Sequence, residues 1–152
     1  MELMEEVVLK GNKFKDVRQI GRAMRVVKPL KKLDLSYNEL EDLLQDSFVD
    51  IINLEELDLS HNKLTDLKRK AVYRMPRLRS VDLSHNRIQS FHSDAFDSTP
   101  LVDELRLHHN RLTDVSDVSF VMDALPKLRL LGKNFIYYEV QGLYGHPSLK
   151  SI

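Results

Sequence analysis

The chain has 152 residues, about the size of one domain, and 42% of them are apolar. This apolar fraction is sufficient for a buried core and argues against a disordered chain. The 23 basic and 23 acidic residues cancel, so the overall charge does not favour a nucleic-acid partner. No apolar run reaches the ~20 residues of a membrane-spanning helix, so we expect no membrane insertion within this segment. The absence of cysteine excludes disulfides and thiolate metal sites.

The main feature of the sequence is an internal repeat of about 24 residues. Five asparagines are spaced at intervals of 26, 24, 24 and 24 residues, and the frame L-x-x-L-x-L-x-x-N-x-L surrounds each of them with every apolar position filled. They are Asn12, Asn38, Asn62, Asn86 and Asn110. The copies start near residues 4, 30, 54, 78 and 102. A sixth copy, starting near residue 128, has Leu128 and Leu131 as its first two anchors, and a partial copy starts at about residue 149.

The frame has a direct physical interpretation. Leucines two positions apart, such as Leu33 and Leu35, point to one face of a short strand. The asparagine amide both donates and accepts, so stacked asparagines can pair backbone groups of neighbouring turns. A second apolar set must return to the same core from the other side of each coil. Its members are Leu43, Phe48, Ile51, Leu67, Val72, Met75, Phe91, Phe96, Val115 and Phe120. No copy can bury its apolar side alone, so neighbouring copies must stack.

The frame, the 24-residue length and the phenylalanine at a fixed offset (Phe48, Phe96 and, two residues displaced, Phe120) resemble the typical leucine-rich repeats of animal cell-surface and secreted proteins. Toll-like receptor ectodomains, Slit and chaoptin-like adhesion proteins belong to this class. The resemblance covers roughly residues 4–136. It implies a β-rich α/β solenoid, a right-handed leucine-rich-repeat superhelix. We therefore expect a parallel sheet on the concave face and extended or 3₁₀ segments on the convex face.

We interpret residues 1–152 as a single leucine-rich-repeat domain. Neither end has the polar capping element that a solenoid needs for solubility, so we expect the domain to be a piece of a longer array. The alternative is that aromatic side chains cover the last coil as a cap. The candidates are Phe135, Tyr137, Tyr138 and Tyr144.

Strand alternation assigns side chains to the concave face, which is the usual recognition surface of a solenoid. A first column holds Glu6, Lys32, Glu56, Ser80 and Glu104. A second holds Val8, Asp34, Asp58, Asp82 and Arg106. A third holds Lys10, Ser36, Ser60, Ser84 and His108, and beside it lie Gly11, Tyr37, His61, His85 and His109. The candidate partner-binding residues are Lys32, Asp34, Tyr37, Glu56, Asp58, His61, Asp82, His85, Glu104, Arg106, His108 and His109.

Two ladders within these columns have more than one interpretation. Neighbouring carboxylates of Asp34, Asp58 and Asp82 would repel by ~1 kcal/mol per pair in water. They are either simply solvated, or they meet a basic partner or a cation. The imidazoles of His61, His85 and His109 are ordinary turn residues, contacts that respond to a partner or to pH, or metal ligands on adjacent rungs.

Basic and acidic residues balance overall, but they are concentrated in different parts of the chain. Residues 10–32 contain nine basic residues and one acid, and residues 34–58 contain nine acids and no base. Lys13, Glu39 and Lys63 occupy one repeat position in consecutive coils, so we expect ion pairs between coils. A basic stretch from Lys68 to Arg79 is either a solvated outer face or a contact for acidic groups.

We expect no enzymatic activity and no cofactor, because the chain has no phosphate-binding glycine loop, G-x-S-x-G or H-E-x-x-H motif. The predicted function is protein binding through the concave face, in a cell-surface or secreted receptor or adhesion protein. The alternatives are structural self-association through array ends or flanks, and a cytoplasmic scaffold. The N-terminal Met-Glu-Leu-Met-Glu-Glu has no signal-peptide character, and no glycosylation sequon is present, so the compartment stays open.

Overall fold

Short strands follow the leucine alternation of the repeat frame. The computed structural model describes residues 3–113, 123–128 and 130–131. Within them lie the helix α1 (Val17–Met24) and the strands β1 (Glu6–Val8), β2 (Lys32–Asp34), β3 (Glu56–Asp58), β4 (Asp66–Leu67), β5 (Ser80–Asp82), β6 (Ser90–Phe91), β7 (Glu104–Arg106) and β8 (Leu130–Leu131). None of the helices found there has the length and apolar character needed to cross a membrane.

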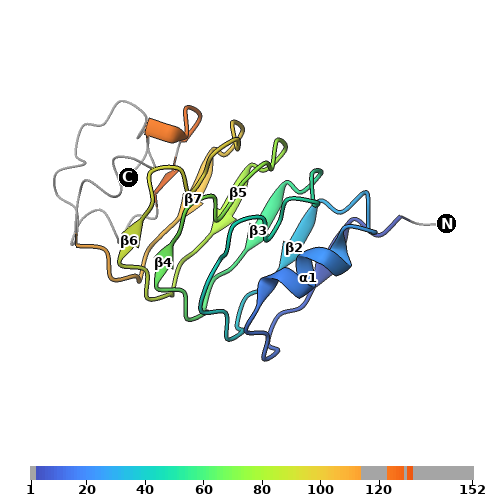
Figure 1. Cartoon of the computed structure of the whole chain (residues 1–152), viewed down its shortest axis with the longest axis horizontal. Helices are drawn as coiled ribbons and strands as arrows, with labels where there is room; N and C mark the ends of the chain where they lie inside the picture. Colours follow the sequence, from blue (N-terminus) through green and yellow to red (C-terminus); the bar gives the residue numbers. More distant parts are fainter. Residues whose placement is uncertain (1–2, 114–122, 129, 132–152) are drawn as a thin grey trace.

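Six of these strands form a parallel sheet in the order β1-β2-β3-β5-β7-β8, with one strand from each coil (Figure 1). Equivalent repeat positions are in register, so that Leu33, Leu57, Val81 and Leu105 lie side by side. A second, two-stranded parallel sheet, β4-β6, lies on the return side. The predicted solenoid with a parallel sheet on its concave face is confirmed.

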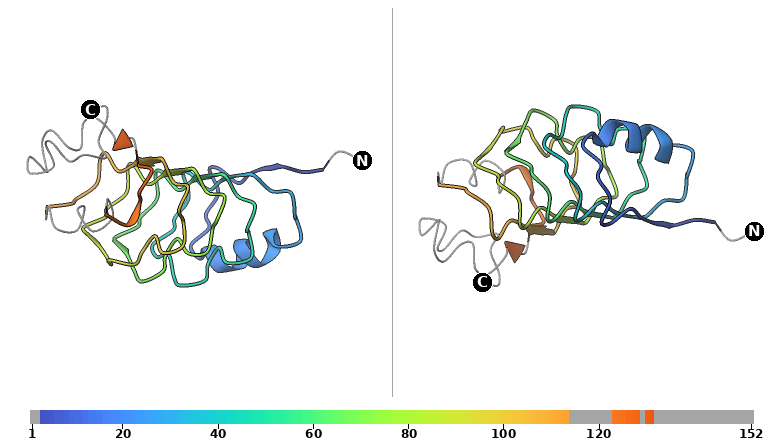
Figure 2. Two further views of the ribbon diagram at one scale, coloured as in Figure 1. Left: turned by 90° about the horizontal axis from the view of Figure 1, so that it is seen from above. Right: turned by 90° about the horizontal axis from the view of Figure 1, so that it is seen from below.

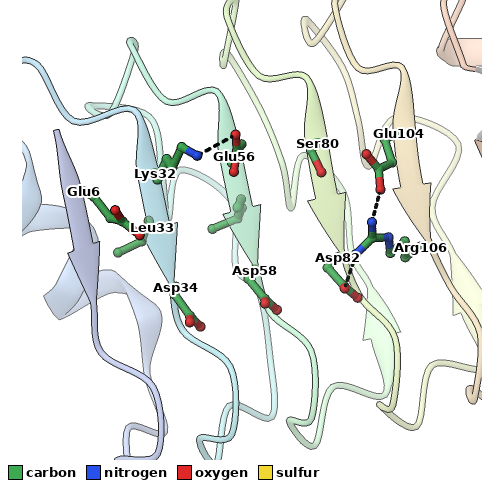
Figure 3. Close-up of a pocket in the computed structure, with 11 residues that line it drawn as sticks. Glu6, Lys32, Leu33, Asp34, Glu56, Asp58, Ser80, Asp82, Glu104 and Arg106 are labelled. Carbon is green, nitrogen blue, oxygen red and sulfur yellow. Dashed lines mark ion pairs between the residues drawn. The ribbon is translucent and has the colours of Figure 1, made fainter.

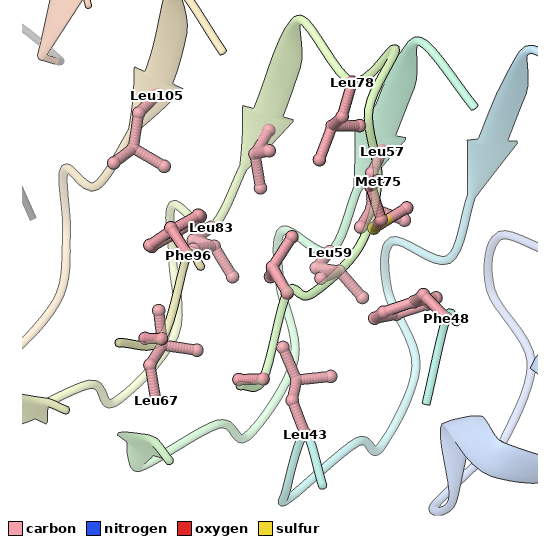
Figure 4. Packing of buried hydrophobic residues seen from close by; sticks show 14 of the residues in the cluster. Leu43, Phe48, Leu57, Leu59, Leu67, Met75, Leu78, Leu83, Phe96 and Leu105 are labelled. Atoms are coloured by element: carbon pink, nitrogen blue, oxygen red, sulfur yellow. The ribbon is translucent and has the colours of Figure 1, made fainter. Parts of the chain in front are cut away.

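The core lies between the six-stranded sheet and the return segments, and Figure 4 shows side chains from both sides meeting there. Leucines of the frame and the predicted return residues contribute together. The return residues are at most 5% exposed, and they are Leu43, Phe48, Ile51, Leu67, Val72, Met75, Phe91 and Phe96. The predicted return residues Val115 and Phe120 lie outside the described residues.

The first copy is less buried than the frame predicts. Met4 is 59% exposed, and Val7, Leu9 and Phe14 are only partly buried against the core. The reason is that β1 pairs on one side only, with β2. A frame position therefore becomes a buried position only where coils stack on both of its sides.

The return segments contain short extended pieces such as β4 and β6 followed by turns, and the first return segment contains α1. Asp16 caps this helix by accepting a hydrogen bond from the Arg18 backbone N–H, and the apolar side chains of Val17 and Ile20 are buried. Figure 2 shows α1 on the side opposite to the six-stranded sheet. The first interval is two residues longer than the others, which fits a helix because it advances about 1.5 Å per residue against about 3.3 Å for a strand.

The helix packs closely on the second coil at Gly21. A Cβ atom at this position would lie 2.0 Å from the Ser47 carbonyl oxygen. We expect Gly21→Ala to lower the free energy of unfolding by about 1–3 kcal/mol through overpacking, although alanine normally favours a helix by about 1 kcal/mol. Thermal unfolding would measure it, with Gln19→Ala on the exposed face of α1 as the control. A stabilising Gly21→Ala would contradict the close packing.

The sixth copy follows the predicted anchors as far as the structure describes it. Leu128 is 2% exposed, and Leu131 of β8 lies in register with Leu105 of β7. The partial copy near residue 149 and the alternative aromatic cap (Phe135, Tyr137, Tyr138 and Tyr144) lie outside the described residues.

Candidate functional site

The asparagine ladder holds adjacent coils together. The Asn62 amide nitrogen donates to the Leu59 and Ser60 carbonyls of its own coil, at 3.0 and 3.2 Å, and to the Leu35 carbonyl of the preceding coil, at 3.0 Å. Its amide oxygen accepts from the Leu40 N–H at 3.0 Å. Asn62 is only 7% exposed, so these bonds pair backbone groups that would otherwise be buried without partners.

The same pattern recurs at Asn38, Asn86 and Asn110, each of which bonds its own coil and the preceding one. Asn12 differs, because it is exposed and its amide donates to the Leu9 carbonyl of its own coil, at 2.8 Å. The ladder therefore has a structural role wherever one coil stacks on another.

The aspartate ladder also has a structural role that the sequence analysis missed. One carboxylate oxygen of Asp58 accepts the Ser60 backbone N–H at 2.9 Å. Asp34 and Asp82 make the equivalent bond two residues ahead. Each bond starts the turn that leads from the strand to the asparagine, as aspartate commonly does in turns. The recurring aspartate two residues before serine, at the end of each strand, could have predicted this turn.

The concave face is a shallow acidic hollow (Figure 3). It is lined by Glu6, Lys32, Asp34, Glu56, Asp58, Ser80, Asp82, Glu104 and Arg106, from the first and second predicted columns. Strand pairing places these columns as predicted, in the register Glu6-Lys32-Glu56-Ser80-Glu104 and Val8-Asp34-Asp58-Asp82-Arg106. Six carboxylates and two cations among the lining residues leave a formal charge of −4.

The two cations of this hollow are both paired. Lys32 contacts Glu56 at 3.1 Å, and Arg106 lies between Glu104 and Asp82, contacting Glu104 and lying 3.5 Å from Asp82. The negative charge that remains lies at Glu6, Asp34 and Asp58, which have no ion pair among the contacts of the described residues, and at the Asp82–Glu104 pair, which shares the single cation Arg106.

Three members of the third predicted column do not lie on the recognition surface, whereas Lys10 of the same column is exposed. Ser36, Ser60 and Ser84 are only 2–6% exposed, because the chain is already turning inward toward the asparagine. This corrects their assignment to the concave face. His108 occupies the same repeat position, and it stays partly exposed because its ring is too large for the space that serine fills.

The residues beside the third column form a stack of rings. Tyr37 stacks on His61, His61 on His85 and His85 on His109, with ring centroids 4.1, 4.1 and 4.2 Å apart and rings within 10° of parallel. The backbone of all four residues has a positive φ of 54° to 57°. This left-handed conformation repeats at the same position of the second to fifth coils and points the side chains in the same direction.

His108 meets this stack edge-on. Its ring centroid lies 5.4 Å from that of His85 and 5.3 Å from that of His109, with interplanar angles of 84° and 76°. The His85 N–H donates to the His108 carbonyl at 3.0 Å, which fixes the two coils against each other. The structure therefore brings His85, His108 and His109 together, whereas His61 lies in the coil before His85.

Burial lowers the pKa of His85 and of His108. Repulsion from neighbouring histidines lowers both pKa values further, and Arg106 also lowers that of His108, while the Asp82 carboxylate acts in the opposite direction. Both imidazoles therefore favour the neutral form more than they would in an unfolded chain.

These lowered pKa values predict a loss of stability on acidification. Below the ordinary histidine pKa of about 6.5 the unfolded chain takes up protons that the folded chain resists, so stability decreases as the pH falls from 7.5 to 5.5. We expect His85→Asn, which tolerates a positive φ, to show a smaller difference in Tm between these two pH values than the wild type. An unchanged difference would contradict the prediction.

Ion pairs join neighbouring coils, and one of them, between Glu39 and Lys63, belongs to the predicted Lys13-Glu39-Lys63 ladder. Lys63 lies 3.1 Å from Glu39 and lowers the pKa of that carboxyl group. Two members of the basic stretch, Lys68 and Arg69, pair with Asp42 at 2.6 Å and with Asp94 at 2.9 Å. Part of the basic stretch is thus already neutralised by adjacent coils.

Stacked coils, a parallel sheet and an asparagine ladder define a leucine-rich-repeat solenoid. The family profile described as Leucine rich repeat matches residues 3–64, 28–88 and 76–132. The chain belongs to the leucine-rich-repeat family, whose domains are general protein-interaction modules and are typically non-enzymatic. A search of curated proteins finds no match.

Solved structures with a similar fold include TLR13 in complex with ssRNA13, with a TM-score of 0.75, 26% identity and 82% of this chain covered. The leucine-rich repeat domain of APL1B has a TM-score of 0.72, 25% identity and 85% coverage. An internalin from Listeria monocytogenes, at 18% identity with a TM-score of 0.61 and 84% coverage, is similar in fold alone. The chain spans 17%, 37% and 34% of the lengths of these three proteins.

Proposed function

We propose that the chain binds a basic surface of a partner protein on its concave face. The observation that carries this proposal is the acidic hollow, in which six carboxylates face two cations that are already paired within the hollow. Burying a lysine or arginine of a partner between Asp34 and Asp58 would relieve the repulsion between these side chains. Their positions on adjacent strands, β2 and β3, make them a rigid pair.

The same charge argues against nucleic acid as the ligand of this face, because carboxylates repel phosphates. The single-stranded RNA in the TLR13 structure is a ligand of that protein. The 24-residue repeat length, which resembles that of animal receptor and adhesion proteins, supports a location at the cell surface or in the extracellular space. A cytoplasmic scaffold is the alternative.

The proposal is tested with a phage-displayed peptide library selected on the chain at 150 mM NaCl. We expect the selected peptides to be enriched in lysine and arginine. Their affinity should fall at least tenfold for Asp34→Asn/Asp58→Asn, which removes both charges but keeps an acceptor for the Ser36 and Ser60 N–H groups. Fluorescence anisotropy with a synthetic copy of one selected peptide measures this loss.

The matched control is Glu41→Gln/Asp50→Asn, which removes two exposed charges from the return side. It should change the affinity less than twofold. Peptides without basic enrichment, or an equal loss in the control variant, would contradict binding by the acidic hollow.

Self-association is a second candidate function, supported by exposed apolar side chains at the first coil. Leu3, Met4 and Val8 are 58–63% exposed beside β1, which is paired on one side only. Strand edges of this kind favour pairing with a second chain. Sedimentation equilibrium at micromolar concentration should then show a dimer that Leu3→Lys/Met4→Lys dissociates, whereas a monomeric wild type would exclude this candidate.

A further inference from the structure

The histidines at the contact of the fourth and fifth coils form a compact cluster. One nitrogen from each of His85, His108 and His109 can be chosen so that all three lie within 4.8 Å of one another. They belong to two coils, since His85 follows β5, and His108 and His109 follow β7. Their convergence depends on the coil stacking, which sets His108 edge-on to two parallel rings.

The fifth coil departs from the repeat at this point. Serine occupies the equivalent position in the three preceding coils, at Ser36, Ser60 and Ser84, where it is buried. The ring stack alone would present its nitrogens in a line along the solenoid. His108 adds a third imidazole whose ring is roughly perpendicular to the other two. The three nitrogens therefore surround one point and do not lie along a line.

We propose that His85, His108 and His109 bind a divalent late first-row transition-metal ion, represented by Zn²⁺, through three imidazole nitrogens. Zinc sites with three protein ligands leave a fourth position for water or for another ligand. Imidazole suits zinc, copper and nickel, and the set contains no carboxylate that would favour Mg²⁺ or Ca²⁺. This site lies beside the acidic hollow and does not depend on the proposed partner binding.

The geometry requires only small adjustments. Zinc–nitrogen bonds of about 2.0–2.1 Å in a tetrahedral arrangement place ligand nitrogens about 3.4 Å apart, so nitrogens that now lie within 4.8 Å of one another must approach by up to about 1.4 Å. His109 is exposed, and His85 and His108 are partly exposed, which leaves room for rotation about their side-chain torsions. Parallel rings such as His85 and His109 must tilt toward each other for their lone pairs to converge on one ion.

The electrostatic surroundings are compatible with a cation. The Asp82 carboxylate acts on both His85 and His108, and Arg106, the nearby positive group, is held by Glu104 and Asp82. Metal binding requires neutral imidazole, and burial favours the neutral form of His85 and His108. The acidic hollow adds a negative field next to the cluster.

The test is isothermal titration of the chain, free of any affinity tag, with ZnCl₂ at pH 7.5. We expect one ion per chain with a Kd in the micromolar range or tighter, and no saturable binding of Mg²⁺. His108→Ser should weaken Zn²⁺ binding at least tenfold, and it should remain folded because it restores the residue of three preceding coils. The control His61→Asn removes a ring from the same stack but outside the triangle, and it should change the affinity less than twofold.

Imidazole ¹⁵N chemical shifts of the wild-type chain provide a second readout that needs no variant. Zn²⁺ should shift the ring nitrogens of His85, His108 and His109 and leave those of His61 and His92 in place. Absence of saturable binding, unchanged affinity in His108→Ser, or equal weakening in His61→Asn would overturn the proposal. A stoichiometry of one ion per two chains would also overturn it, because it would show a site made between chains.

Discussion

Replacing Asn62 by alanine is expected to lower the free energy of unfolding by about 2–4 kcal/mol. The substitution leaves the buried Leu40 N–H without its acceptor and removes three donated bonds. An unpaired buried group costs about 1–3 kcal/mol. The loss of stability stays below the summed contributions of the individual hydrogen bonds because two of the carbonyls keep another donor. The Leu35 carbonyl still accepts from Asn38, and the Leu59 carbonyl still accepts from Asn86. Urea denaturation followed by circular dichroism measures the change.

The matched control is Asn12→Ala. Asn12 occupies the same repeat position but is exposed and donates to a carbonyl of its own coil, so the loss should stay below about 1 kcal/mol. Equal losses in the two variants would show that the asparagine acts only within its own turn, and the account of the ladder as a joint between coils would be wrong.

Phe96→Ala is expected to lower the free energy of unfolding by about 3–5 kcal/mol, the usual range for a buried phenylalanine. Phe96 is 2% exposed and packs into the core from the return side (Figure 4). Truncation removes apolar contacts and leaves a cavity where two coils meet. Thermal and urea unfolding of the purified variant should show a lower midpoint.

Two further substitutions separate cavity formation from a general effect of mutation. Phe96→Leu keeps most of the side-chain volume and should cost less than Phe96→Ala. Ile52→Ala removes an apolar side chain that is 55% exposed, so its effect should stay within about 0.5 kcal/mol. A Phe96→Ala variant as stable as Ile52→Ala would contradict the placement of Phe96 in the core.

The two loss-of-stability experiments concern the scaffold, whereas the charge and histidine variants concern its surface. Asp34 and Asp58 belong to the scaffold and to the surface. One carboxylate oxygen of each accepts a backbone N–H, and the charge still faces the hollow. Substitution by asparagine separates the two roles. This dual role explains why aspartate is suited to the position even where no partner is bound.

Most of the fold could be predicted from the spacing of apolar residues. A leucine at every second position defines one face of a strand, and a constant interval between coils brings equivalent strands into register. Leu57 and Val81 pair as the frame predicts, and so do the acidic residues beside them. The predicted columns of the concave face follow from the same alternation and register.

The helix α1 and its contact at Gly21 could not be predicted in this way. The longer first interval was visible in the sequence, but the conformation that its two extra residues adopt depends on what they pack against. Gly21 approaches the Ser47 carbonyl because Val17 and Ile20 are buried against the core. The reduced burial of Met4 has a similar origin, since it depends on the number of neighbouring coils and not on the residue itself.

By itself, the sequence determined the period of the solenoid, the leucine and asparagine positions, and the acidic columns, because these depend on local alternation repeated at a constant interval. The tertiary structure decided which side chains of different coils meet. It buries Ser36 and Ser84, turns the Asp82 carboxylate toward a backbone N–H, and brings His85 and His108 into one cluster. The physical reason is that the left-handed turn residues set the direction of each side chain within its own repeat. The side chains that it then meets depend on the stacking of one coil on the next, which the sequence of a single repeat does not contain.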